Sequence, residues 1–277
     1  MKADSAVRRA LLWWFRWPGN PYVTINFAVD FTNARAFLAA LPPPKVTVNH
    51  LVAGAIARTL AEFPLANARI VNDRIVPSEH VGIAMPVNLL GHEAAETREV
   101  SMAVLERAET LTLRQVAEAT TRVVHEERRG KAQNPVIAAI IRGVEAAPRP
   151  FVDRGLGLLD RMMRRQLLNE RIFAMVPVTT GLSNAGAAID KPPGMLFRGA
   201  DIAIPQRLVH IGTFWGTSAL QDEVIAVDGV PSVRPMLPVL FLFDHRLVDG
   251  VMAARVATRF GSILTDPAGE FGADGGS

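Results

Sequence analysis

The sequence contains no cysteine among its 277 residues. This absence excludes disulfide bonds, a thiolate nucleophile and cysteine-based zinc or iron–sulfur sites. Aromatic residues make up only 6% of the chain, a single one of them is tyrosine, and the formal charge at pH 7 is only +3. Nucleic-acid binding requires a strongly basic surface or a platform of stacked rings, so we expect no nucleic-acid partner.

Long hydrophobic runs are also missing. The longest, residues 135–141 and 237–243, fall far short of the ~18 apolar residues that cross a bilayer. Basic residues precede a short apolar run at the start of the chain, but no small-residue cleavage site follows, so we expect this segment to be retained. The composition predicts a soluble or peripheral protein, located in the cytoplasm.

Hydrophobic periodicity predicts alternating strands and helices. The expected strands are 22–30, two short ones within 70–76, 81–87, 176–182, 209–214, 224–227 and 238–243. The expected helices are 48–63, 113–129, which Thr112 and Gln115 begin with a capping-box spacing, and 251–265.

The domain organisation follows from these elements. No repeat or linker divides the chain, so we expect one α/β domain over 22–265, in which helices cover a mixed sheet as a two-layer α+β sandwich. An aromatic and basic segment (1–21) precedes it, and we expect a disordered Gly-rich tail over 266–277.

The residues best suited to chemistry follow the apolar run 238–243. His245 comes directly after this predicted buried strand, and Asp249 follows just before Gly250 and a predicted helix. An imidazole has an ordinary pKa near ~6.5, so its neutral form accepts a proton from a thiol or an alcohol at physiological pH. His245 is therefore the candidate general base. The remaining histidines are expected to be ordinary core or surface residues: His50, His80, His92, His125 and His210.

Two motifs resemble a known family. Asp244-His-Arg-Leu-Val-Asp-Gly250 resembles the His-x-x-x-Asp-Gly catalytic loop shared by chloramphenicol acetyltransferase and the acyltransferase core of 2-oxo acid dehydrogenase complexes, the dihydrolipoamide acyltransferases. Its Asp-His-Arg form is that of the second group. Upstream, Leu182-Ser-Asn-Ala-Gly186 is similar to the Ile-Ser-Asn-Leu-Gly segment of the same cores, and weaker agreement extends over roughly 22–133 and 175–267.

The resemblance implies a chloramphenicol acetyltransferase-like fold and a homotrimer, or a multiple of trimers, with active sites between subunits. Acyl-coenzyme A enters such a site from one side and a thiol or hydroxyl acceptor from the other. By position, His245 deprotonates the acceptor, which attacks the thioester directly, and Ser183 donates a hydrogen bond to the oxyanion. Asp249 orients the loop through an arginine, of which Arg246 is the nearest in sequence.

The sequence departs from the dehydrogenase-complex enzymes in its accessory domains. Those enzymes carry an N-terminal lipoyl domain and a subunit-binding domain, and these 277 residues contain neither. We therefore expect no covalently bound lipoyl group in this chain. The acceptor is then expected to be another carrier-borne thiol or a small diffusible compound.

Three alternatives to this function stay open to different degrees. Gly181-Leu-Ser-Asn-Ala185 nearly matches the Gly-x-Ser-x-Gly elbow of serine hydrolases, with Ser183 as nucleophile, but the final glycine is missing. The absent domains also allow a catalytically inactive assembly or binding protein of the same fold. Metal binding by His245 and Asp249 lacks a third ligand, so we expect no metal site.

Residues 135–172 match nothing in the family and are expected to form a divergent helical insertion. Within it, residues 151–170 predict an amphipathic helix whose arginines lie largely away from its apolar side. Packing against the domain is the first interpretation of this helix; a lid over the substrate channel and peripheral membrane contact stay open. The tryptophan-rich residues 10–17 present the same choice between packing and membrane contact.

Overall fold

The computed structural model describes residues 20–71, 74–88, 100–129, 146, 148–164, 177–184, 194–202, 204 and 210–276. The strands in these ranges are β1 (Tyr22–Asp30), β2 (Ala68–Val71), β3 (Arg74–Pro77), β4 (Ile83–Asn88), β5 (Val100–Leu105), β6 (Thr180–Asn184), β7 (Thr213–Thr217), β8 (Gln221–Val227) and β9 (Val230–Asp244). The helices are α2 (Thr32–Ala40), α3 (Val48–Glu62), the 3₁₀ helix η2 (Ala108–Thr110), α4 (Leu113–Arg128), α6 (Arg149–Arg164), α8 (Gly250–Thr265) and α9 (Pro267–Phe271). None of these helices has the length and apolar composition needed to cross a membrane.

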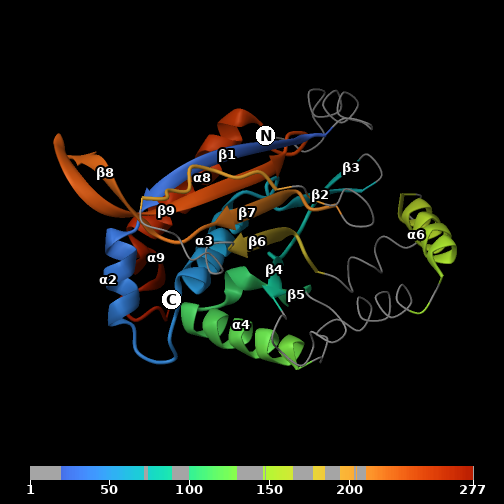
Figure 1. The fold of residues 1–277 in the computed structure, drawn as a ribbon, viewed down its shortest axis with the longest axis horizontal. Helices are drawn as coiled ribbons and strands as arrows, with labels where there is room; N and C mark the ends of the chain where they lie inside the picture. Colours follow the sequence, from blue (N-terminus) through green and yellow to red (C-terminus); the bar gives the residue numbers. More distant parts are fainter. Residues whose placement is uncertain are drawn as a thin grey trace.

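Seven strands form one mixed sheet in the order β1-β9-β7-β6-β4-β5, with β8 paired to the first part of β9 (Figure 1). Strands β4, β6 and β7 run parallel to one another, whereas β9 is antiparallel to β1, β7 and β8. Strands β2 and β3 form a separate hairpin. The long strand β9 therefore joins several parts of the sheet and ends at Asp244, next to His245.

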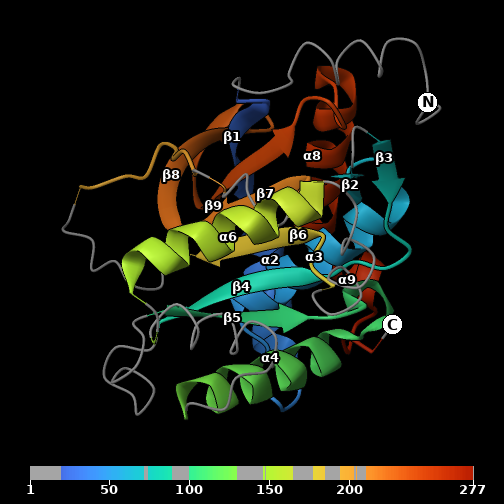
Figure 2. The same cartoon turned by 90° about the vertical axis from the view of Figure 1, so that its right-hand side faces the viewer.

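Helices α3 and α8 cover one face of the sheet, with α2 and α9 beside them (Figures 1 and 2). Between these helices and the sheet, Trp215 lies with its ring centroid 4.3 Å from that of Phe241 and 4.6 Å from that of Phe260. All three side chains are fully buried. This aromatic cluster joins β7, β9 and α8, and it fixes the central strands that lead to the candidate site.

Capping boxes define the starts of two helices. At α4, the Thr112 hydroxyl oxygen accepts the N–H of Gln115 at 3.2 Å, and the Gln115 side chain accepts the N–H of Thr112 at 2.9 Å, as the spacing predicts. At α3, His50 takes the place of the glutamine, because its Nδ1 accepts the N–H of Thr47 at 3.2 Å. Burial lowers the pKa of His50. Its role is structural, as expected from the sequence.

The predicted mixed sheet covered by helices is confirmed, and most predicted elements are present within a few residues of their expected bounds. Helix α2 and strand β5 were not predicted, and β9 begins at Val230 rather than at Pro238. Pro231 and Pro235 lack an N–H donor, and they are tolerated in this strand because this part of β9 pairs with β8 as a two-stranded ribbon, where one edge needs no N–H donors.

The expected disorder of residues 266–277 is wrong. Asp266 caps a new helix, α9, by accepting the N–H of Gly269 at 3.1 Å, and Pro267 occupies its first turn, where a missing N–H costs nothing. The Phe271 ring that ends α9 is 0% exposed and lies against Gly54 of α3. Burial of this one ring holds the segment to the domain.

The insertion contains a helix, α6, which overlaps the predicted range 151–170 but begins two residues earlier and ends at Arg164. Figure 1 shows α6 apart from the sheet and from the other helices. Phe151 and Leu158 on this helix are 64% and 57% exposed, whereas Val152, Leu156 and Leu159 are half-buried. The rest of the insertion, apart from residues 146 and 148, and residues 1–19 with their predicted aromatic segment lie outside the described residues.

We predict that Phe271→Ala destabilises the protein by about 3–5 kcal/mol, the usual cost of removing a buried phenylalanine ring. Urea unfolding at pH 7 measures the difference. Ala273→Ser, an exposed position two residues further on, is the control and should leave the midpoint unchanged. Equal stability of the Phe271 variant and the wild-type protein would contradict the assignment of α9 to the core.

Candidate active site

His245 lies in a tight turn at the end of β9. The turn is closed by the N–H groups of Leu247 and Val248, which donate to the Asp244 carbonyl oxygen at 2.9 and 3.0 Å. The backbone N–H of His245 donates to the Pro21 carbonyl oxygen at 2.8 Å, which ties the turn to the start of β1. The imidazole is half-buried, and its ring meets Phe243 edge to face.

The tautomer of His245 follows from one hydrogen bond. Its Nδ1 lies 3.1 Å from the carbonyl oxygen of Val248 in the same turn. A carbonyl oxygen only accepts, so Nδ1 must carry the proton and donate it. In the neutral ring, Nε2 then holds the lone pair that can take up a proton, as a general base requires.

The first residue of this turn, Asp244, has a buried carboxylate. Asp244 is 0% exposed, and the Arg246 guanidinium donates to its Oδ1 at 2.9 Å and to its Oδ2 at 2.6 Å. Oδ2 also accepts a hydrogen bond from His210 Nε2 at 2.8 Å. Burial acts to raise the pKa of Asp244, but the hydrogen bonds and charges of His210 and Arg246 outweigh it and hold the pKa below its ordinary value. Asp244 is thus an ionised and fully hydrogen-bonded anchor for the residue beside it.

Asp249 has a structural position. Its side chain is the N-cap of α8 and accepts the N–H of Met252 at 2.8 Å. This contact fixes the end of the turn to the helix. The arginine suggested from sequence, Arg246, forms its ion pair with Asp244.

Ser183 lies on the opposite face of the sheet from α3 and α8, in a row of residues that crosses four strands. Cross-strand pairing places Asn26 of β1 beside Leu240 of β9, Leu240 beside Gly216 of β7, and Gly216 beside Ser183 of β6. Gly216 has no side chain, so the row is hollow at its centre. A Cβ atom there would lie 3.3 Å from Leu240 and from Ile202.

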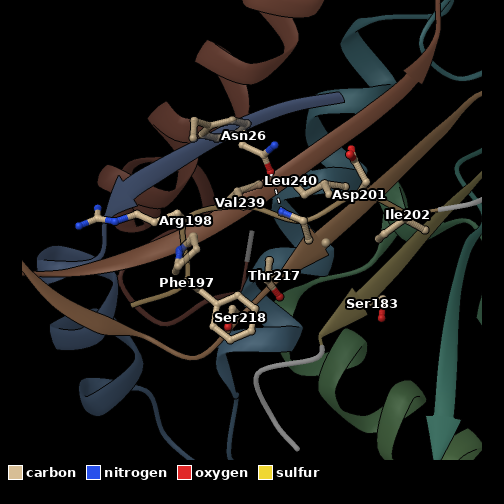
Figure 3. A pocket seen from close by; sticks show the side chains of 15 residues that line it. Asn26, Ser183, Phe197, Arg198, Asp201, Ile202, Thr217, Ser218, Val239 and Leu240 are labelled. Carbon is tan, nitrogen blue, oxygen red and sulfur yellow. Dashed lines mark hydrogen bonds between the residues drawn. The ribbon is translucent and has the colours of Figure 1, made fainter. Parts of the chain in front are cut away.

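This hollow is a pocket of about 240 Å³ (Figure 3). Ser183 lies at one end of the pocket and residues 197–202 form a wall, held to the sheet where the Asn26 side-chain oxygen accepts the N–H of Ala200. Thr217 and Ser218 also line it, and their buried hydroxyl oxygens have no hydrogen-bond partner within the described part of the chain. The rest of the lining is largely apolar, so the pocket combines an apolar surface with two hydroxyl groups that are able to bind a polar part of a ligand.

One chain does not bring Ser183 and His245 together. Ser183 is level with Leu240 of β9, which is five residues before His245, and strands β6 and β9 are two strand spacings apart with β7 between them. At about 3.4 Å per residue and about 4.8 Å per strand, the two side chains are roughly 15–20 Å apart. A site that uses both must combine residues from two subunits.

The hydrolase alternative has a specific geometric difficulty. A nucleophile elbow places its serine on a sharp turn between a strand and a helix. Ser183 instead lies within strand β6 and pairs in parallel with Gly216.

Sequence reasoning missed His210. It was expected to be an ordinary core or surface residue, yet it donates to Asp244 next to the candidate base. Only a contact across the fold reveals this, because His210 and Asp244 are 34 residues apart in sequence. Among the described residues, no cluster of three or more His, Cys, Asp or Glu is placed to hold a metal ion.

The chain is similar in sequence to a known protein family. Residues 17–135 and 212–271, well over half of the chain, match the family described as 2-oxoacid dehydrogenases acyltransferase (catalytic domain). The dihydrolipoyllysine-residue succinyltransferase component of the mitochondrial 2-oxoglutarate dehydrogenase complex of Mus musculus is 30% identical over 132 residues. That alignment covers 48% of this chain but only 26% of the relative, so this chain spans about a quarter of the relative's length.

Two solved structures share the fold. The cubic core of the pyruvate dehydrogenase multienzyme complex matches with a TM-score of 0.62 and 19% identity, over 95% of this chain and 88% of that one. A chloramphenicol acetyltransferase matches with a TM-score of 0.56 and 15% identity, over 95% and 98% of the two chains. These findings confirm the resemblance and the fold that the two motifs indicated.

We predict that Asp244→Asn destabilises the protein by roughly 3 kcal/mol at pH 7, because it removes the buried carboxylate charge that pairs with the half-buried Arg246. The folded pKa lies below the unfolded value near ~3.9, so this stabilisation is complete above that value and is lost as the pH falls through the folded pKa. Urea unfolding from pH 7 into the acid range measures both effects. The variant should lose less stability on acidification than the wild-type protein, whereas the exposed control Asp222→Asn should behave like the wild type at pH 7.

Proposed function

The chain belongs to the 2-oxoacid dehydrogenase acyltransferase (catalytic domain) family, and we propose that it transfers an acyl group between coenzyme A and a thiol or hydroxyl acceptor. The observation that carries this proposal is the hydrogen bond from His245 Nδ1 to the Val248 carbonyl oxygen. It leaves Nε2 as the basic nitrogen of a half-buried ring at the end of a rigid strand.

The reaction we propose proceeds by direct attack. His245 Nε2 takes the proton of the acceptor S–H or O–H group as that atom attacks the thioester carbonyl carbon. Negative charge develops on the carbonyl oxygen, and the Ser183 hydroxyl donates a hydrogen bond to it. When the carbon–sulfur bond breaks, the coenzyme A thiolate takes the proton back from the imidazolium, which restores the neutral base.

The pocket beside Ser183 supports a binding site for the acyl donor. It extends from Ser183 along Gly216 and Leu240, and the segment 197–202 covers it. An extended chain with an apolar body and a few polar groups suits this shape and lining. The pocket lines up with the serine, so a thioester held there would present its carbonyl group to Ser183.

Assembly completes the proposed site. The roughly 15–20 Å between Ser183 and His245 in one chain, estimated from strand spacings, requires a second subunit to supply one of them. Contact between two different surfaces closes into a ring when the rotation allows it, and a homotrimer is the ring that we propose. Coenzyme A then reaches the site from the Ser183 side and the acceptor from the His245 side.

We predict that His245→Ala lowers kcat by roughly 10²–10⁴-fold, since no other group takes the proton. Ser183→Ala should lower kcat by roughly 10²–10³-fold through the lost oxyanion contact. Release of free coenzyme A from a panel of acyl donors and thiol or hydroxyl acceptors measures both. The exposed His125→Ala serves as control, and transfer by His245→Ala at the wild-type rate would exclude this residue as the base.

Mixing the two inactive variants tests where the site is assembled. If His245 of one subunit meets Ser183 of the next, an equal mixture of His245→Ala and Ser183→Ala chains should form intact sites at about one quarter of its interfaces. Co-refolded or co-expressed mixtures should therefore recover about a quarter of the wild-type activity. Mixtures as inactive as the separate variants would show that both residues must belong to one chain.

A further inference from the structure

His210 connects three separate parts of the fold. It lies before β7, its side chain is only 15% exposed, and its Nε2 lies 2.8 Å from the Asp244 carboxylate. Its other ring nitrogen, Nδ1, accepts the backbone N–H of Ile70 in β2 at 3.0 Å. Nδ1 therefore holds a lone pair and Nε2 donates its proton to Asp244, so both ring nitrogens are used in one fixed orientation.

The two partners of Asp244 constrain it in different ways. Arg246 is two residues away, so its ion pair fixes the shape of the turn that contains His245. His210 belongs to another segment of the chain, so its hydrogen bond fixes where that turn lies relative to the rest of the sheet. His245 lies between Asp244 and Arg246, and a shift of the Asp244 carboxylate would carry the base with it.

The surroundings leave His210 little freedom. Tyr22 stacks on the ring with 6.4 Å between centroids and donates its O–H to the Ile211 carbonyl oxygen at 2.8 Å. Burial raises the pKa of Tyr22, which keeps this hydroxyl protonated as a donor. Tyr22 is also the cross-strand partner of Asp244. The ring is therefore held from the β1 side as well as by its two hydrogen bonds.

The hairpin β2–β3 reaches the turn at the same place. A Cβ atom on Gly212 would lie 2.4 Å from the Ala68 carbonyl oxygen and 2.8 Å from the Leu247 side chain, so only glycine fits between hairpin and turn. The Gly212 carbonyl oxygen accepts the N–H of Asp244 at 2.9 Å. Hairpin, His210 segment and catalytic turn form one packed unit.

We propose that His210 is a positioning residue for the general base, which it holds in place through Asp244 while the β2–β3 hairpin holds His210. This inference rests on the proposed function of His245. His210 itself touches neither reacting atom in this proposal. It acts by fixing the position of a group whose displacement by about 1 Å can cost roughly 100-fold in rate.

Two conservative variants separate the two hydrogen bonds of His210. The amide of glutamine reaches the position of Nε2, so His210→Gln keeps a donor to Asp244 and loses the acceptor for Ile70. The shorter amide of asparagine reaches the position of Nδ1, so His210→Asn keeps the acceptor for Ile70 and loses the donor to Asp244. We expect His210→Asn to lose more stability on thermal unfolding than His210→Gln, because a hydrogen bond to a charged group contributes more than one between neutral groups, so kcat is compared at a temperature where both variants are fully folded.

The inference predicts that turnover depends on the Asp244 contact alone. His210→Asn should lower kcat by roughly 10–100-fold with little change in the KM for the acyl donor, because the pocket beside Ser183 is remote. His210→Gln should keep kcat within about threefold of the wild type, and His125→Asn at the exposed surface should be silent. Equal kcat values for the asparagine and glutamine variants would overturn the positioning role.

A second measurement distinguishes failure of this inference from failure of the proposed function. Nitrogen-15 NMR of the histidine rings reports whether Nδ1 of His245 carries the proton, without any turnover. We expect all three proteins to share this tautomer, because the Val248 carbonyl oxygen in the same turn sets it, and we expect the ring signals of His245 to shift in His210→Asn but not in His210→Gln. That pattern in a protein without transferase activity would overturn the proposed function alone, whereas unchanged His245 signals in His210→Asn would overturn the positioning role.

Discussion

The buried carboxylate of Asp244 is the interaction on which the candidate site depends. An isolated charge at 0% exposure would be very costly, but here a guanidinium, an imidazole and a backbone N–H all donate to it. Removal of any one donor leaves part of the charge uncompensated. The chain thus has one low-energy arrangement of the turn after β9, and His245 has one position.

Local and long-range interactions determine different properties of this turn. Interactions within a few residues set its internal geometry: His245 donates to Val248, and Asp249 caps α8. Contacts from distant segments, through Pro21 and His210, set where the turn lies on the sheet. A general base needs both, because its proton-accepting nitrogen must exist in the right tautomer and must also meet its substrate.

This separation of local from long-range interactions explains which features could be predicted from the sequence. Strand β1 and helices α3, α4 and α8 each have a clear hydrophobic period, and a motif of seven residues marks the turn of His245, so these features could be predicted. The first part of β9 could not, because its prolines are tolerated only through pairing with β8. Phe271 was expected in a disordered Gly-rich tail, because only the folded core shows the space that its ring fills beside α3.

The site residues show the same limit. His210 carries no local sign of its role: its partners Ile70 and Asp244 lie 140 and 34 residues away, and another histidine, His50, caps a helix instead. The pocket depends on a row of four residues from four strands, in which Gly216 matters for the side chain it lacks. Such rows exist only after the strands have paired, so a single sequence does not predict them.

The position of β9 also accounts for the proposed division of the site between subunits. The strand passes the Ser183 row at Leu240 and continues to His245, so the geometry of one continuous β-strand keeps the proposed base and the proposed oxyanion donor apart. A strand does not fold back on itself within five residues without losing its pairing with β1 and β7. The rigidity that orients His245 therefore also prevents its own chain from completing the site, and catalysis by these two residues requires assembly.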